Sequence, residues 1–259
     1  MFFLIIVESV KSESPFTIKP ARDYLLLGVG TLTGVSAYFV LDKEKSLTHE
    51  CISSFSRYDV NAFDRGAVDN WSPGANKFSE AAMALSISAM LPLIASPEAR
   101  SDGFTIGVMT AETLIWAISL PQLSKMATLR YRPYVYNESV NIEDKLEPRA
   151  TESFFSRTTT VAFASAVFSA TLFDAYYPNS PYSKKIWIGS LTCASLAGYL
   201  RYYSGQHFTT DVLAGALVGS FIGWAIPYMH RNDRQNHNNV SFGVSPAEEG
   251  IKAVMVMKF

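Results

Sequence analysis

His207 and Asp211 lie four positions apart, and their types and spacing could support nucleophilic chemistry. On a helix, side chains at this spacing share a face, so the carboxylate can accept a ring proton of the imidazole. That contact fixes the tautomer and leaves the other ring nitrogen free to attack an electrophile. The pair predicts a nucleophilic histidine or, as an alternative, a structural pair that caps a helix.

Three cations accompany this pair in the sequence. Lys125 and Arg132 are seven positions apart, and they share one face if the helix continues to Arg132 and stops at Pro133. Arg201 lies shortly before His207. Fixed cations bind oxyanions well, because a guanidinium group can make two parallel contacts to a phosphate. The alternative is that these basic residues mark a membrane boundary and touch lipid headgroups.

Apolar stretches of helical length must position these residues. Each is close to the ~20 residues that cross a bilayer core. Hydrophobic residues make up 48% of the chain and charged residues only 17%, which is mild for a chain made wholly of membrane spans. Apolar runs this long on all six elements nevertheless favour a membrane-embedded, all-α bundle of six helices. Ser, Thr and Ala lower the hydropathy of several stretches, so a soluble six-helix bundle is the alternative. The stretches run over Tyr24–Leu41, Phe78–Ala95, Phe104–Ser124, Thr158–Tyr176, Lys185–Tyr203 and Thr209–Met229.

The net charge, the two cysteines and Glu112 further limit the class of protein. The net charge is −1, so no basic field predicts nucleic acid as a partner. Cys51 and Cys193 have no metal-ligand spacing and are interpreted as packing residues. Glu112, inside the third stretch, is expected to face the bundle interior at a functional or paired site, or to face water if the helix is soluble. We expect no metal and no cofactor.

The chain divides into three parts by composition. Residues 1–23 resemble a hydrophobic leader or the remnant of a signal, residues 24–230 hold the six-helix domain, and residues 231–259 hold a polar linker and a β-hairpin. In the hairpin, Ile251–Phe259 is expected to pair with Val240–Val244. His230 and His237 are assigned to the linker as solvated residues rather than metal ligands. Residues 42–77 predict an amphipathic surface helix, a cap over a pocket mouth or a plain loop.

The order of the motifs resembles a known family. Lys125, six residues, Arg132 and Pro133 are followed by Arg201, five residues, His207, three residues, Asp211 and then Val-Leu-Ala-Gly. This pattern is similar to the first and third signature motifs of the phosphatidic acid phosphatase type 2 and haloperoxidase superfamily, over residues 112–219. The resemblance implies a phosphate pocket lined by Lys125, Arg132 and Arg201. It also implies that His207 forms a phosphohistidine and that Asp211 orients it.

The middle motif departs from that family, which usually has Pro-Ser-Gly-His at the start of the fourth helix. Ser156 is retained and is expected to bind phosphate, whereas Thr158 stands where the family has its general-acid histidine, next to Arg157. A threonine cannot protonate an alkoxide leaving group near neutral pH. The resemblance therefore implies a membrane lipid phosphatase or pyrophosphatase acting on a phosphorylated lipid, with diphosphates favoured.

Two alternatives to that activity stay open. One is a catalytically impaired pseudophosphatase that binds a phosphorylated lipid. The other is a soluble acid phosphatase or a vanadate-dependent haloperoxidase on the same scaffold.

Helix alternation and loop charges give an expected topology. With six spans, the ends of the third and fifth stretches and the starts of the fourth and sixth fall on one side, so the motifs can meet. Short loops on the other side carry Arg100, Lys184, Lys185, Arg231 and Arg234. The positive-inside tendency then predicts a protein of the bacterial cell envelope with its pocket facing away from the cytoplasm.

Overall fold

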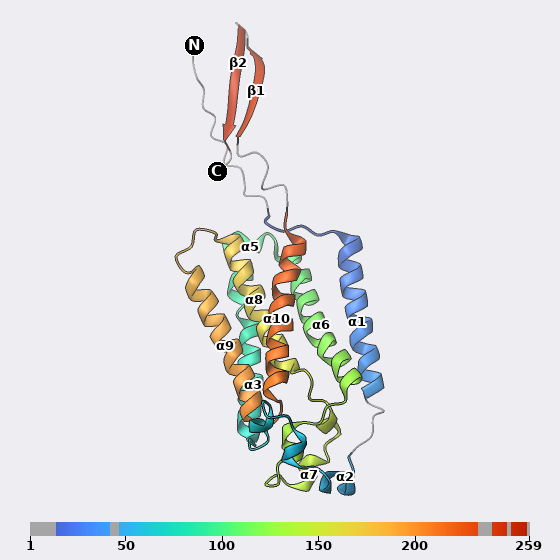
Figure 1. The fold of residues 1–259 in the computed structure, drawn as a ribbon. Helices are drawn as coiled ribbons and strands as arrows, with labels where there is room; N and C mark the ends of the chain where they lie inside the picture. The colour runs from blue at the N-terminus through green and yellow to red at the C-terminus, as the bar shows by residue number, and fades with distance from the viewer. Residues whose placement is uncertain (1–13, 42–46, 233–239, 248–249, 258–259) are drawn as a thin grey trace. The chain divides into compact units, whose positions relative to one another are not determined.

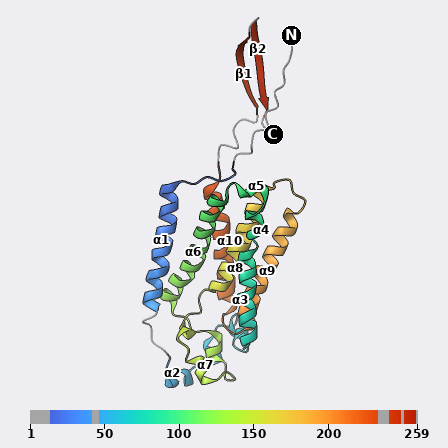
Figure 2. The same ribbon diagram turned by 180° about the vertical axis from the view of Figure 1, so that it is seen from behind.

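The structure is a computed structural model, and it describes residues 14–41, 47–232, 240–247 and 250–257. Residues 18–230 form one compact unit, a bundle of long helices that run up and down in alternation (Figures 1 and 2). Five of the six stretches predicted from the sequence each lie within one helix, and the second is helical to Ser88 and again over Leu91–Ile94. The long helices are α1 (Pro20–Leu41), α3 (Pro73–Ser88), α6 (Gly103–Thr128), α8 (Arg157–Tyr176), α9 (Ser183–Tyr203) and α10 (Thr209–His230).

Four helical segments in the described part of the chain are long and apolar enough to cross a membrane. They are residues 73–94, residues 103–136, α8 and α10. The first joins α3 to the short helix α4 (Leu91–Ile94), and α5 (Pro97–Arg100) then leads into α6. Large apolar side chains on the outside of α10 are exposed at helical spacing, as expected of a surface that faces lipid rather than water. These are Leu213, Leu217, Phe221, Trp224 and Tyr228.

Helix α8 is the centre of the bundle and packs against α3, α6, α9 and α10. Its contact with α10 is close because Gly215, Gly219 and Gly223 recur every four residues on one face of α10. A Cβ atom built at Gly219 would lie 2.3 Å from the Thr160 carbonyl oxygen of α8. The stripe of glycines therefore sets the separation of the two helices whose first turns carry the predicted site.

A substitution on this stripe should disturb both stability and activity. We expect Gly219→Ala to destabilise the protein by about 1–3 kcal/mol, because the methyl group must push two backbones apart. Gly107→Ala is the matched control, since a Cβ at Gly107 on α6 meets nothing within 4 Å. Thermal unfolding in detergent measures the difference. Equal melting temperatures for the two variants would contradict the close packing.

Two connecting segments cover one end of the bundle. The first contains α2 (His49–Ser53) and the 3₁₀ turns η1 (Arg57–Asp59) and η2 (Arg65–Ala67), and the second contains η3 (Pro133–Tyr136), α7 (Ile142–Lys145) and η4 (Pro148–Thr151). They share a small apolar core of their own. The first segment forms short turns instead of one amphipathic helix, and it packs through Val60, Ala67 and Val68 against Phe208, next to His207.

The other compact unit holds the remaining ends of the chain. Within it, Phe16 forms a β-bridge with Arg231, and strands β1 (Val240–Ala247) and β2 (Gly250–Met257) pair antiparallel, Val240 opposite Met257. Most of the predicted leader (residues 1–13), and His237 with the centre of the linker, lie outside the described residues.

One assignment from the sequence is wrong. His230 is not a solvated linker residue: it is the last residue of α10 and is fully buried, because α10 runs one residue further than predicted and turns the ring inward. Glu112 also faces the interior, as expected, with no exposed surface. Cys51 and Cys193 are both free thiols.

Candidate active site

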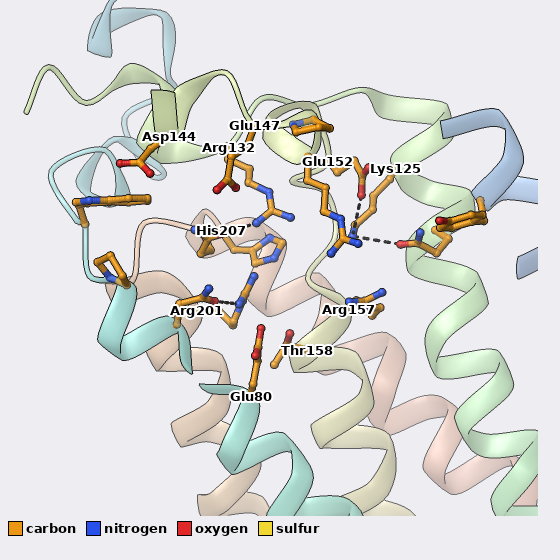
Figure 3. A pocket seen from close by; sticks show the side chains of 18 residues that line it. Glu80, Lys125, Arg132, Asp144, Glu147, Glu152, Arg157, Thr158, Arg201 and His207 are labelled. Atoms are coloured by element: carbon orange, nitrogen blue, oxygen red, sulfur yellow. Dashed lines mark hydrogen bonds and ion pairs between the residues drawn. The ribbon is translucent and has the colours of Figure 1, made fainter. Parts of the chain in front are cut away.

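A cavity of about 390 Å³ opens where the helix ends meet the connecting segments. Lys125, Arg132, Arg201 and His207 line it together, and all four are buried. Their nitrogen-bearing ends turn toward a common space, with the His207 ring between the two arginines (Figure 3). The structure thus brings together side chains from α6, α9 and the two loops that the sequence motifs singled out.

The His207 ring is held in one tautomer. Its Nδ1 lies 2.7 Å from the backbone carbonyl oxygen of Ser153, which can only accept a hydrogen bond. Nδ1 therefore carries the ring hydrogen, and Nε2 keeps its lone pair. Burial lowers the pKa of His207 to about 3, and the nearby Arg201 and Arg132 add to the shift. The imidazole is neutral near pH 7, as a nucleophile must be.

Asp211 supports this histidine less directly than the spacing predicts. Its Oδ2 atom is 3.6 Å from His207 Nδ1, beyond hydrogen-bond range, while it accepts hydrogen bonds from the Ser153 hydroxyl at 2.5 Å and the Phe208 backbone N–H at 2.8 Å. Ser153 thus contacts both members of the pair. Asp211 joins the backbone of Phe208, next to His207, to the Ser153 hydroxyl, and the carbonyl of Ser153 orients the ring.

Sequence reasoning missed a second layer behind this pair, made by Arg130 and Asp64. Arg130 donates to Asp211 Oδ1 at 2.6 Å and to Asp64 Oδ2 at 2.7 Å. Burial alone raises the pKa of Asp64, but hydrogen bonds from Asn61, Thr210 and Arg130 outweigh it and hold the pKa below its usual value. Arg130 also lies over the Phe208 ring, 4.2 Å from its centre. The network anchors the first connecting segment to the start of α10.

The three buried cations have few anionic partners. Lys125 Nζ lies 3.2 Å from Gln122 Oε1 and 3.7 Å from Glu152 Oε2. Arg132 donates to the side-chain oxygen of Gln206, and Arg201 donates to that of Asn76, so both guanidinium groups contact neutral amides. Among the described residues, Nε of each arginine has no hydrogen-bond partner.

Arg132 reaches the pocket by a route that differs from the prediction. The helix does not continue to it: α6 ends at Thr128, and Leu129 adopts a left-handed conformation with φ 42°. Arg132 then lies in extended chain before Pro133, where its N–H bonds to the Ala150 carbonyl at 2.8 Å. The prediction that Arg132 shares a helical face with Lys125 is therefore wrong, although both residues line the same cavity.

The middle motif forms the first turn of α8. Ser156 is the N-cap: its hydroxyl accepts from the Thr159 N–H and from the Thr159 hydroxyl, and it is absent from the residues that line the cavity. Its predicted contact with phosphate is thus not seen. Arg157 and Thr158 do line the cavity, and so does Glu80 (Figure 3). A helix N-terminus at this position favours a bound anion.

Gly205 makes the turn that presents His207. Its φ of +72° is a conformation that glycine adopts without strain, and a Cβ there would lie 2.1 Å from the Asn70 carbonyl oxygen. Its own carbonyl accepts the N–H of Tyr134 at 3.2 Å, which joins this turn to the segment after Arg132. The turn thus holds two of the motifs together.

Fold and site together define a helical membrane protein with a pocket lined by buried cations. A sequence model of the PAP2 superfamily matches residues 105–235, just over half of the chain, and the chain belongs to this superfamily. Its apolar helices make it an integral membrane protein. This favours the membrane branch over the soluble phosphatase and haloperoxidase alternatives.

Two individual proteins are similar to the chain. An undecaprenyl-diphosphatase of Sulfolobus acidocaldarius is 30% identical over 119 residues, which are 46% of this chain and 52% of the relative. The chain thus spans about half the length of the curated relative it matches. The crystal structure of a transmembrane PAP2 type phosphatidylglycerolphosphate phosphatase from Bacillus subtilis is 21% identical, with a TM-score of 0.47, and the match covers 83% of this chain and 98% of that one.

Proposed function

We propose that this protein is a membrane lipid phosphatase that favours diphosphate headgroups and works through a phosphohistidine at His207. The observation that carries the proposal is the cluster of Lys125, Arg132 and Arg201 around the His207 ring. Lys125 has Glu152 at 3.7 Å, whereas Arg132 and Arg201 donate to neutral amides. Buried guanidinium groups paired in this way are costly, and a bound phosphate oxyanion supplies the missing charge. The 30% identical relative is itself named as a diphosphatase.

The proposed chemistry has two steps. His207 Nε2 attacks the terminal phosphorus, the bond between phosphorus and the bridging oxygen breaks, and the leaving lipid phosphate takes the electron pair. Water then attacks the phosphohistidine, which releases inorganic phosphate and restores the neutral ring. Lys125, Arg132 and Arg201 balance the charge that develops on the transferred group.

Thr158 decides which leaving group is suitable. An alkoxide is the conjugate base of an alcohol with a pKa near that of water, about 16, and needs a proton as it departs. A phosphate monoester dianion has a conjugate acid with a pKa of about 6, so it leaves without help. Arg157, on the same first turn of α8, can stabilise the departing charge. A diphosphate lipid is therefore the substrate class that fits this first turn.

A panel of phosphorylated lipids tests the proposal. Purified protein in detergent should release phosphate from a lipid diphosphate about 10²- to 10⁴-fold faster than from a lipid monophosphate of the same chain, the range that general acid catalysis supplies. The rate measured in parallel with a His207→Ala variant serves as the background. Equal rates on the two lipids would contradict the assignment of Thr158.

A pseudophosphatase is the second candidate, and Thr158 is the observation that favours it. In that role Lys125, Arg132 and Arg201 hold a phosphorylated headgroup without cleaving it. Binding of both lipids with no turnover above the His207→Ala background would select this function. The loop charges support a pocket that faces away from the cytoplasm in either case.

A further inference from the structure

A second buried polar cluster lies at the other end of the bundle, far from the pocket. Asp23 in the first turn of α1, Glu112 in α6 and His230 at the end of α10 come together there. Asp211 and His230 are separated by 19 residues of α10, a rise of about 29 Å. The three helices lie side by side in both views (Figures 1 and 2). The cluster therefore takes no part in the chemistry at His207.

The nitrogen and oxygen atoms of the three side chains face one another. His230 Nε2 lies 3.3 Å from Asp23 Oδ1 and 3.4 Å from Glu112 Oε2, and all three ligand atoms lie within 4.8 Å of each other. Glu112 and His230 have no exposed surface, and Asp23 is 4% exposed. A cluster this deeply buried must balance its charge locally.

The hydrogen bonds around His230 do not balance the charge of the cluster. Its Nδ1 lies 2.8 Å from the Ile226 carbonyl oxygen, so Nδ1 carries the hydrogen and the lone pair of a neutral ring at Nε2 faces two carboxylates. In the described part of the chain, neither oxygen of Glu112 has a hydrogen-bond partner, and neither does His230 Nε2. Three acceptors that face one another with no donor between them call for a cation.

Asp23 is contacted by one cation and one backbone donor. Arg22 Nε lies 2.6 Å from Asp23 Oδ1, and the Lys19 backbone N–H donates to Asp23 Oδ2 at 2.8 Å. His230 Nε2 lies 3.4 Å from Glu112 Oε2, and Arg22 also interacts electrostatically with Glu112. A proton on His230 Nε2 has two acceptors at 3.3 and 3.4 Å and no short contact to either. A metal ion, in contrast, contacts all three ligands at once.

We propose that Asp23, Glu112 and His230 bind one divalent metal ion of the zinc class, which ties α1, α6 and α10 together. Zinc takes histidine nitrogen and carboxylate oxygen at about 2.0–2.1 Å, and tetrahedral bonds of that length place ligand atoms roughly 3.3 Å apart. The two separations from His230 Nε2 match this value. The Ile226 carbonyl supplies the second contact that metal-binding imidazoles usually make, and water takes the fourth position. The metal has a structural role here.

Metal binding can be measured on the whole protein in detergent after treatment with a chelator. With Zn²⁺ alone as the probe, calorimetry and elemental analysis should give one ion per chain, and Zn²⁺ should raise the melting temperature. Glu112→Gln and His230→Gln should each weaken binding by more than the ~10–100-fold typical of losing a second-shell contact. The matched controls are Glu50→Gln and His49→Gln, which alter exposed residues of α2 and should bind as the wild type does.

Two further measurements keep the result independent of folding and of the pocket. Co²⁺ added to the wild type should give the strong visible absorption of tetrahedral cobalt, so this readout needs no variant. His207→Ala should retain the metal. Zinc bound no better by the wild type than by Glu112→Gln, a missing cobalt band, or loss of the metal in His207→Ala would each overturn the proposal. The first result would mean that a proton on His230 or Glu112 balances the cluster.

Discussion

His207→Ala is expected to lower phosphate release from a lipid diphosphate by on the order of 10⁵-fold or more. The reason is that no other described residue places a neutral nucleophilic nitrogen among Lys125, Arg132 and Arg201. The pKa of about 3 keeps His207 unprotonated over the working range, so the loss should be the same from pH 5 to pH 8. Release of inorganic phosphate measures it.

The control for this variant is His49→Ala, which removes an exposed imidazole from α2. It should keep wild-type activity. The His207→Ala protein should still bind the lipid, because the three cations remain and alanine leaves the cavity open. Substantial turnover by His207→Ala would assign the nucleophile to another residue and contradict the proposed chemistry.

Thr158→His is expected to increase activity: it should raise the rate of hydrolysis of a lipid monophosphate by about 10²- to 10⁴-fold. The new imidazole stands at the start of α8, where Thr158 lines the cavity, and can protonate the alkoxide as it leaves. Hydrolysis of the diphosphate should change little, because its leaving group needs no proton. The substitution thus converts a preference for diphosphates into activity on both lipids.

The pH dependence identifies the cause of that gain. A general acid works only when protonated, so monophosphate hydrolysis by the variant should fall as the pH rises through the pKa of the new histidine, ordinarily near 6.5. Thr158→Asn is the control: it adds a polar side chain without an acidic proton and should give no gain. A Thr158→His enzyme with unchanged monophosphate rates would show that the middle motif is aligned incorrectly.

The spacing of residues in the sequence predicts the long helices, because a helix depends on residues that are near one another in the chain. Apolar runs of about 20 residues locate the long helices, because helix length is set by the layer that the helices cross. The four-residue spacing brings Asp211 to 3.6 Å from His207 Nδ1, but His207 precedes α10 and the Ser153 carbonyl, rather than the carboxylate, lies within hydrogen-bond range of the ring. The same reasoning fails for Arg132, because a left-handed Leu129 ends α6 early and no spacing rule signals that the helix stops there.

Long-range contacts account for what the sequence does not reveal. Asp64 accepts from Thr210 across 146 residues, and Arg130 joins it to Asp211. Asp64 stands far from both motifs in the sequence, whereas Arg130 lies inside the first motif at a position that its spacing does not mark. His230 sits beside a polar run in the sequence, which makes it look solvated. Only the packing of α1 and α6 against the end of α10 turns the ring toward Asp23 and Glu112. The contacts of these residues are formed by the fold and leave no local pattern in the sequence.

The central claim is that the phosphate is transferred to a ring nitrogen of His207 among the three cations. Rapid quenching of the enzyme during turnover of a lipid diphosphate labelled in its terminal phosphate, followed by peptide mapping, measures it directly. We predict an acid-labile, base-stable phosphate on the peptide that carries His207. Turnover with the label on any other residue, or with no labelled protein at any quench time, would contradict the account.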